Sequence, residues 1–212
     1  MNIKSFVFNP FYENTYVVHS SQKNAYIFDP GCYEPFELNE LTDYIQRESL
    51  TIKAVINTHC HIDHVLGNHA IKSMYEAPLW IPKNEKVVFD AVVAYAPQWG
   101  INGYEPASID RFLLESDRLV LDEIEFEILE VPGHSPGHHM FYERAKELIV
   151  GGDVLFKESI GRTDLPGGNH EDLIRNIKEK VYTLPEQVTI YPGHGPKTTV
   201  GYEKRHNPFV KG

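Results

Sequence analysis

The chain has 212 residues, of which 42% are hydrophobic and 24% are charged, and its formal net charge is −10 at pH 7. This composition is typical of a folded globular protein, and the length fits one large domain or two small ones. The negative field disfavours a nucleic-acid partner, and no apolar stretch approaches the roughly 20 residues of a membrane span, so we expect neither partner.

Short runs rich in β-branched and aromatic residues recur along the chain, with turn residues between them. In chain order, the predicted strands cover residues 3–8, 15–19, 25–28, 54–57, 124–131, 148–150 and 188–191. Helical patterns lie between them, one around Leu38, Leu41 and Ile45 and others over residues 63–76, 84–95 and 171–182. The mixture predicts an α/β fold rather than a helical bundle.

The helix over residues 171–182 has the clearest start signals. Asn169 is a suitable N-cap, and Glu171 and Asp172 complement the helix dipole in the first turn. Residues 97–111 are rich in Gly, Pro and polar residues and predict a long loop. Such a loop either covers a site or only connects two elements, and the sequence leaves both open.

A heptapeptide with three histidines, Thr-His-Cys-His-Ile-Asp-His over residues 58–64, follows the predicted strand 54–57 and precedes a helix. In an extended segment alternate side chains share a face, so His59 and His61 can converge on one ion. As the chain enters the helix, Asp63 and His64 turn toward a second position. Cys60 and its neighbour Ile62 are expected to point the other way.

Three other predicted strands are followed by a glycine turn and then by a histidine or an aspartate. The predicted metal ligands are therefore His59, His61, Asp63, His64, His134, Asp153 and His194. Any one of them alone would more often be an ordinary surface or core residue. Seven at strand ends, with four of them in one heptapeptide, indicate a metal site, because His and Asp are its usual ligands.

Seven ligands exceed the four of a closed structural zinc site, so we predict two divalent metal ions that share Asp153. A shell of imidazoles and carboxylates suits zinc, iron(II) or manganese without choosing among them, and zinc is our first choice. Two such ions lower the pKa of a bound water from ~15.7 toward ~7, and metal-bound hydroxide can then attack a carbonyl whose oxyanion the ions stabilise. The residues predict hydrolysis of a small-molecule ester or thioester, with Asp63 and Asp153 as catalytic residues.

The motifs at residues 58–64, at 132–137 (Pro-Gly-His-Ser-Pro-Gly), at Gly152-Asp153 and at 192–195 (Pro-Gly-His-Gly) together resemble those of the metallo-β-lactamase-fold hydrolases. Within these, the chain is most similar to the small glyoxalase II-like hydroxyacylglutathione hydrolases. The resemblance implies a four-layer αββα sandwich as a single domain over residues 1–212. It assigns one ion to His59, His61 and His134, the other to Asp63, His64 and His194, and the bridging position to Asp153.

The resemblance also implies further roles around the metal ligands. Asp29 would orient a ligand histidine, and Arg162 stands where this family carries a basic residue that contacts the glutathione of a substrate such as S-lactoylglutathione. Two tyrosines that contact glutathione in the family are replaced here, by Gly195 and by Asp164. The thiol carrier is therefore left open. One of His138 and His139 is expected to support the site.

Two alternatives share these motifs. The first is a persulfide dioxygenase with one iron, bound by the counterparts of His59, His134 and Asp153; the second is a non-catalytic metal-binding domain on the same fold. Two cysteines cannot form a disulfide framework, and the first ten residues lack an apolar signal segment. We therefore expect a cytoplasmic protein, while its oligomeric state is left open.

Overall fold

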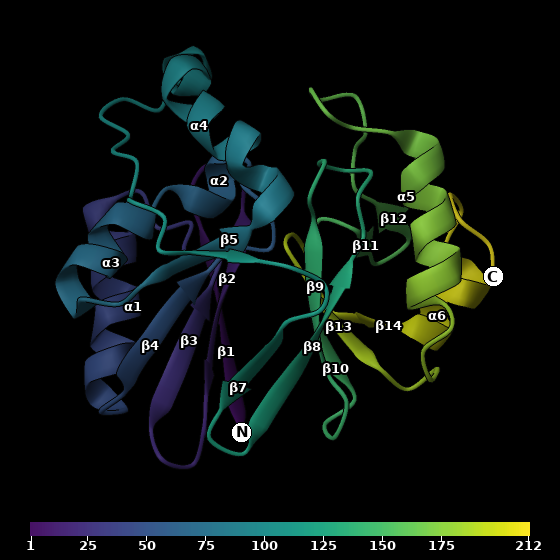
Figure 1. Ribbon diagram of the computed structural model, residues 1–212, viewed down its shortest axis with the longest axis horizontal. Helices are drawn as coiled ribbons and strands as arrows, with labels where there is room; N and C mark the ends of the chain where they lie inside the picture. The colour runs from purple at the N-terminus through teal and green to yellow at the C-terminus, as the bar shows by residue number, and fades with distance from the viewer. The chain divides into compact units, whose positions relative to one another are not determined.

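Two six-stranded sheets form the framework of the computed structural model, which describes residues 1–212 (Figure 1). Their strand orders are β1-β2-β3-β4-β5-β6 and β14-β13-β10-β9-β8-β7, and β11 and β12 form a separate hairpin. The chain divides into two compact units. The first comprises Met1–Leu113 and Val120–Ile124, and the second comprises Leu114–Leu119 and Glu125–Gly212.

The sheet of the first unit is mixed. Its strands are β1 (Asn2–Phe8), β2 (Glu13–His19), β3 (Asn24–Phe28), β4 (Thr51–Ile56), β5 (Leu79–Pro82) and β6 (Arg111–Leu113). The first three pair antiparallel, and β3 to β6 pair in parallel, with Phe28 opposite Ile56. Because parallel strands end at the same edge, the residues that follow Phe28 and Ile56 meet there. This edge carries the heptapeptide of residues 58–64, which is predicted to bind metal.

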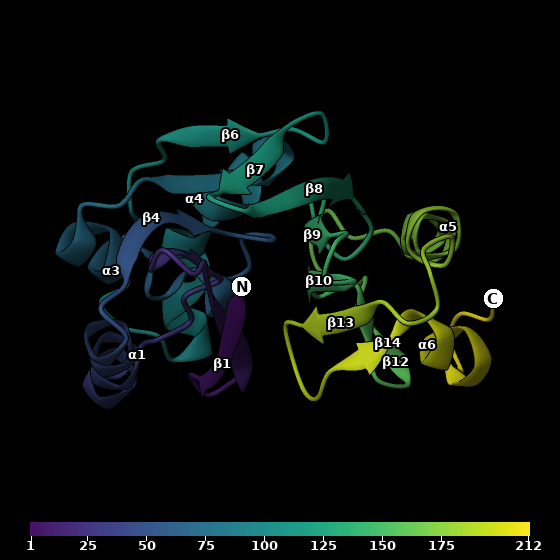
Figure 2. The same ribbon diagram turned by 90° about the horizontal axis from the view of Figure 1, so that it is seen from below.

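The helices of the first unit are α1 (Pro35–Arg47), α2 (Ile62–Val65), α3 (Asn68–Tyr75), η1 (Lys83–Glu85), α4 (Lys86–Tyr95) and η2 (Ala96–Trp99). In Figures 1 and 2, α1 and α3 lie along the same side of the sheet. Their apolar residues Leu41, Ile45 and Ile71 are fully or almost fully buried and share one core with strand residues such as Val55 and Leu79. Burial of this apolar face holds the sheet and its helices together.

The prediction of one continuous helix over residues 63–76 was wrong, because the chain turns between α2 and α3. At the turn, the Gly67 N–H donates to the carbonyl of Pro30 at 2.7 Å, outside any helix. A Cβ atom on Gly67 would lie only 2.5 Å from the Cys32 sulfur. The break therefore packs the ligand helix α2 tightly against the loop after β3.

The second unit contains β8 (Ile124–Glu130, beginning at the unit boundary), β9 (His139–Glu143), β10 (Leu148–Gly152), β11 (Leu155–Phe156), β12 (Ser159–Ile160), β13 (Thr189–Pro192) and β14 (Thr198–Thr199). The strand β7 (Arg118–Leu121) spans the boundary between the units. The sheet is mixed, since β10 and β13 are parallel while β8, β9 and β10 are antiparallel neighbours. The residues that follow β10 and β13 therefore reach one edge.

The helices α5 (His170–Asn176) and α6 (Val200–His206) lie on the same side of this second sheet (Figure 2). A π-helical turn, η3 (Ile177–Val181), continues α5. Leu173, Ile177 and Val181 are fully buried and share a core with Ile149 and Ile190 of the strands. The predicted N-cap is confirmed, because the Asn169 side chain accepts the N–H of Asp172.

Each predicted strand overlaps an observed one, and the α/β prediction is confirmed. The short strands β5, β6, β7, β11, β12 and β14 were not predicted, because runs of two to four residues carry little periodicity. The seven-residue helix α6 (Val200–His206) was not predicted either. The predicted loop is observed from residue 100 to residue 110, between η2 and β6. None of the helices is long and apolar enough to cross a membrane.

Candidate metal centre

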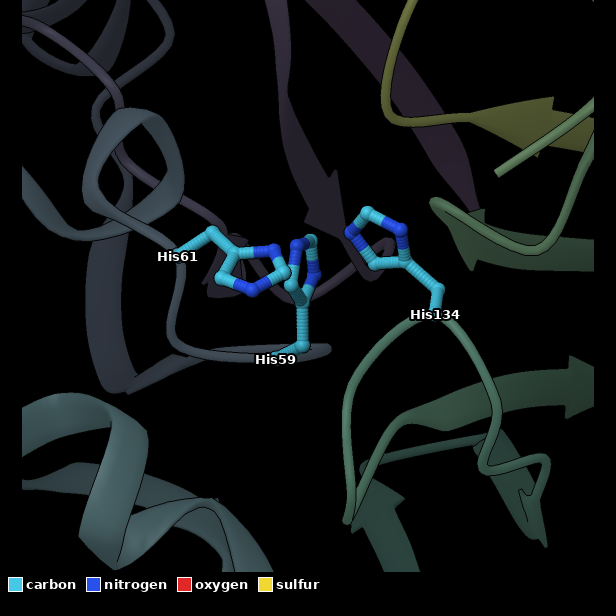
Figure 3. Close-up of side chains that lie close together, drawn as sticks. All are labelled: His59, His61 and His134. Carbon is cyan, nitrogen blue, oxygen red and sulfur yellow. The ribbon is translucent and has the colours of Figure 1, made fainter. Parts of the chain in front are cut away.

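Four of the predicted ligands lie in the loop and the short helix that follow β4. The ring of His59 is fully buried, and its centroid lies 4.9 Å from that of His61 and 4.1 Å from that of His64. Figure 3 shows His59 and His61 leaving the same loop with their rings close together. Cys60 and Ile62 point into the hydrophobic core, as the alternation of the segment predicts. The loop therefore presents its imidazoles on one face.

The carboxylate of Asp29, which follows β3, orients the next part of this loop. It is almost fully buried and accepts the Thr58 N–H at 2.7 Å and the Thr58 hydroxyl at 2.6 Å. Its Oδ2 also lies 3.1 Å from Nδ1 of His64. An imidazole that donates from Nδ1 to a carboxylate leaves Nε2 for a metal and becomes a more basic ligand. Asp29, His59 and His64 keep their ligand-type atoms within 4.8 Å of one another.

The spacing between Asp63 and His64 fits a shared ion. Asp63 Oδ2 lies 3.5 Å from Nε2 of His64, which is too long for a good hydrogen bond. Two ligands of a tetrahedral ion with bonds of ~2.1 Å lie about 3.4 Å apart. The pair is therefore spaced as metal ligands are, rather than as hydrogen-bond partners.

Glu13 is a fully buried carboxyl group behind His64, with Oε1 at 3.9 Å from Nδ1 of that histidine. Burial raises the pKa of Glu13 well above its ordinary value. The Thr15 hydroxyl lies 2.9 Å from Glu13 Oε2 and 2.8 Å from the Asp29 carbonyl, and it has one proton for two acceptors. A protonated Glu13 supplies the missing donor. A Cβ on Gly31 would lie 2.6 Å from the backbone carbonyl oxygen of Asp63 as well as 2.1 Å from Oε2, so a larger residue would force the backbone to move.

Glu85 fixes the backbone between the first two histidines. It is fully buried at the end of η1, and its Oε2 accepts the Cys60 N–H at 2.9 Å. Asn57, also fully buried, donates to the carbonyl of His64 at 2.9 Å and accepts from Asn68 at 2.8 Å. No roles for Glu13, Glu85 or Asn57 were predicted from the sequence. Their only sequence signal is a polar residue next to an apolar run, which many surface positions share.

The other three predicted ligands lie together in the second unit. Asp153 Oδ2 is 3.6 Å from Nε2 of His134 and 3.5 Å from Nε2 of His194. Both distances again match the roughly 3.4 Å edge of a tetrahedral coordination shell better than a hydrogen bond. One carboxylate oxygen thus lies between two imidazole nitrogens.

His134, labelled on its own loop in Figure 3, is oriented by a neutral group. Its Nδ1 lies 2.7 Å from the carbonyl oxygen of Arg162 and must carry the proton, because a carbonyl only accepts. This leaves Nε2 for a metal. A Cβ on Gly161 would lie 1.9 Å from the Asp153 carbonyl, and one on Gly133 would lie 2.4 Å from the Leu173 nitrogen. Gly161 and Gly133 are therefore needed for close backbone packing.

His138 directly precedes β9 and His139 begins it, and of the two His138 contacts Asp153. Its Nε2 accepts the backbone N–H of Asp153 at 2.9 Å. His139 faces Phe141, and its buried Nδ1 has no hydrogen-bond partner. Burial lowers the pKa of His139 to about 4, so it is neutral at physiological pH.

The guanidinium of Arg162, predicted to bind substrate, is paired within its own loop. Its Nε and Nη2 donate to the two carboxylate oxygens of Asp164 at 2.6 and 2.7 Å. These hydrogen bonds lower the pKa of Asp164 to about 2. Both side chains are exposed. A role of Arg162 in substrate binding stays a prediction.

The fold and these clusters of histidine and aspartate define a class. The chain belongs to the Metallo-beta-lactamase superfamily, whose family model matches residues 8–194. Its fold is the metallo-β-lactamase fold of two mixed sheets flanked by helices, as the motifs predicted. Together with the histidine and aspartate clusters, this membership identifies a metal-dependent hydrolase.

Individual relatives cover almost the whole chain. Hydroxyacylglutathione hydrolase GloC of Haemophilus influenzae is 38% identical over 99% of this chain and 98% of its own length. The crystal structure of BLEG-1 B3 metallo-beta-lactamase is similar with a TM-score of 0.88, 34% identity and full coverage of both chains. That of TTHA1623 in a di-iron-bound form gives a TM-score of 0.87 and 33% identity over 98% of this chain and 100% of that one.

Proposed function

We propose that the protein is a binuclear metal hydrolase that cleaves an acyl thioester. The observation that carries the proposal is the carboxylate of Asp153, whose Oδ2 lies at nearly equal distances from Nε2 of His134 and of His194. A side chain in that position suits a bridge between two cations. The similarity to hydroxyacylglutathione hydrolase GloC supports the thioester substrate.

We further propose that the two compact units form one catalytic domain, since the family model extends across both. In this proposal one ion is held by three histidines, the other by two histidines and an aspartate, and one carboxylate is shared. The ligand sets are His59, His61 and His134; Asp63, His64 and His194; and the shared Asp153. Zinc is our first choice for the metal, and the di-iron form of TTHA1623 makes iron the main alternative.

Two divalent cations, when bound, supply a water of lowered pKa and positive charge for the carbonyl oxygen of the substrate. The protein's own part is to hold its ligands in one protonation state. Asp29 fixes the proton of His64 on Nδ1, and the Arg162 carbonyl does the same for His134. The Asp63 carboxylate is partly exposed, and we propose that it orients the attacking water and holds its proton.

Substrate binding would use Arg162. Its pair with Asp164 is exposed, and such pairs contribute little free energy, so a substrate carboxylate can replace Asp164. Bidentate hydrogen bonding by the guanidinium suits a glutathione carboxylate. A small-molecule acyl thioester therefore stays our predicted substrate. The cytoplasm stays our predicted location.

The test compares the parent protein with Asp153→Asn. We expect about two metal ions per chain by elemental analysis, turnover of S-lactoylglutathione by the parent, and loss of turnover by at least ~100-fold in the folded variant. Near-parental activity of Asp153→Asn would refute the bridging role. One iron per chain, with oxygen uptake on glutathione persulfide and no thioester hydrolysis, would instead identify an oxygenase. Full metal loading without either reaction would support a non-catalytic metal-binding protein.

A further inference from the structure

A second histidine, His138, stands behind the proposed bridging aspartate. Its side chain is fully buried just before β9, and its Nε2 lies 2.9 Å from the backbone nitrogen of Asp153. The ring centroid is 6.1 Å from that of His134, with an angle of 74° between the two planes. His138 is thus next to the ligands without belonging to the predicted ligand set.

The direction of this hydrogen bond fixes the protonation state of His138. A backbone N–H only donates, so Nε2 must accept and carries no proton. His138 is therefore the neutral tautomer with its proton on Nδ1. A ring in this state can hold the backbone of its neighbour without adding charge to the metal site.

The backbone at Asp153 needs such a partner because it has left the sheet. The parallel ladder of β10 and β13 shifts register between Val150 and Gly152 and ends there. Gly152 adopts a φ of 49°, and its carbonyl accepts from Gly193 at 2.7 Å. The N–H of Asp153 lies beyond this ladder, and a buried N–H without a partner costs about 1–3 kcal/mol.

The position of the Asp153 carboxylate depends on that backbone. Aspartate has a short side chain, so a rotation of its peptide displaces Oδ2 from the imidazoles of His134 and His194. The backbone carbonyl of Asp153 is already restricted in position, because its oxygen packs closely on Gly161. The N–H side is held by His138.

We propose that His138 is a positioning residue that fixes the backbone of Asp153 and thereby the carboxylate between the two metal ions. This inference rests on the proposed ligand role of Asp153. Loss of the acceptor at Nε2 weakens metal binding, whereas the identity of the ring is unimportant. The effect is on the site and is separable from overall folding.

Three substitutions distinguish the acceptor from the volume of the side chain. His138→Gln places an amide oxygen at the same number of bonds from Cα as Nε2 and keeps the acceptor. His138→Asn places its amide oxygen one bond closer to Cα, so that it does not reach the Asp153 N–H. His138→Leu has no acceptor. His139→Leu is the matched control, because His139 is the adjacent buried histidine and has no contact with the ligand set.

The measurement is the titration of each metal-free protein with Co²⁺, followed by the ligand-field absorption and by competition with a chromophoric chelator. We expect His138→Leu and His138→Asn to bind Co²⁺ about 10- to 100-fold more weakly. We expect parental binding and spectra for His138→Gln and for His139→Leu. Circular dichroism and thermal melting establish that each variant is folded.

Parental Co²⁺ affinity in folded His138→Leu would overturn the proposal, and so would a failure of His138→Gln to restore binding. If His138→Leu does not fold, the comparison of the glutamine and asparagine variants decides. Asp153→Asn is titrated in parallel. Parental binding by Asp153→Asn would reject the ligand role itself, whereas weak binding by Asp153→Asn with parental binding by His138→Leu rejects only the role of His138.

Discussion

The two units hold their proposed metal ligands by different chemistry. In the first unit, buried carboxyl groups surround the ligand loop: Asp29 accepts from Thr58 and His64, and Glu85 accepts from Cys60. In the second unit, neutral groups accept the corresponding hydrogen bonds: the backbone carbonyl of Arg162 accepts from His134, and the imidazole of His138 accepts from the Asp153 N–H. The first arrangement depends on charge, and the second depends on close backbone packing.

This difference has consequences for mutation. A buried carboxylate with several donors is sensitive to the loss of its charge, because each donor is left without a partner. A loop held by carbonyls and glycines has little charge to lose, but it has no space for an added atom. We therefore expect the removal of a buried charge to destabilise the first unit. We expect an added atom to destabilise the second unit.

The largest effect is expected from Gly161→Ala in the second unit. The new Cβ would lie 1.9 Å from the Asp153 carbonyl, and backbone atoms on both sides would have to move. We expect a loss of about 3 kcal/mol in the free energy of unfolding, measured by urea denaturation. Gly103→Ala is the control, because it has a φ of 75° but nothing within 4 Å, and it should cost only about 1 kcal/mol. Equal losses would argue against packing as the determinant.

Asp29→Ala is expected to have a similar but slightly smaller effect in the first unit. It removes the acceptor of two hydrogen bonds from Thr58 and one from His64. We expect a loss of about 2–3 kcal/mol in stability and a 10- to 100-fold loss of metal affinity. Asp29→Asn keeps one carbonyl oxygen and should lose less of both. If alanine and asparagine behaved alike, the carboxylate would not be the orienting group.

The parts of the site that follow strand ends could be predicted from the sequence, because they depend on local order. His134, Asp153 and His194 each follow a β-type run and a glycine turn, and the parallel pairing of β10 and β13 then brings the last two to one edge. The alternation within the heptapeptide likewise predicts that Cys60 faces the core, as observed.

The groups that hold these ligands could not be predicted, because they come from distant parts of the chain. Glu85 is 25 residues from the Cys60 N–H that it accepts, and Glu13 reaches His64 from β2. No local pattern distinguishes them from surface acids. The break at Gly67 was missed for the same reason, since its cause is contact with Pro30 and Cys32. Tertiary contact, rather than helix propensity, decided that boundary.

Glu13→Gln tests whether every carboxyl group of the first unit acts through charge. Burial raises the pKa of Glu13, so the folded protein binds this proton more tightly than the unfolded chain does. The parent protein therefore loses stability as pH rises above the ordinary value of 4.5 toward the raised pKa. Glutamine cannot ionise, and its amide can still donate to Thr15.

We expect Glu13→Gln to differ from the parent by less than about 1 kcal/mol near pH 4 and to gain relative stability as pH rises to 8. Urea denaturation of the metal-free proteins across this range measures the difference. A variant that loses relative stability as pH rises would show that Glu13 is ionised in the folded protein, and the network around Thr15 would then need another donor.

The smallest effect on stability is expected from Asp164→Asn, where the charge is exposed. The hydrogen bonds from Arg162 lower the pKa of Asp164 to about 2, so the pair is intact at neutral pH and is lost only as pH falls from 3.8 through that value. Solvent screens such a pair, and we expect no measurable change in unfolding. Release of the guanidinium should instead lower the KM for a thioester that carries a carboxylate by about two- to five-fold.

The ion pair of the exposed Arg175 with the partly exposed Asp172 provides the control, because Asp172→Asn also removes a paired negative charge from the same unit. The KM for a neutral thioester should be unaffected by either substitution. The decrease in KM for the anionic thioester should become smaller as salt is added. An unchanged KM in Asp164→Asn, or an equal gain in Asp172→Asn, would mean that Arg162 does not receive the substrate carboxylate. In that case the guanidinium would only stabilise its own loop, in which the backbone carbonyl of Arg162 orients His134.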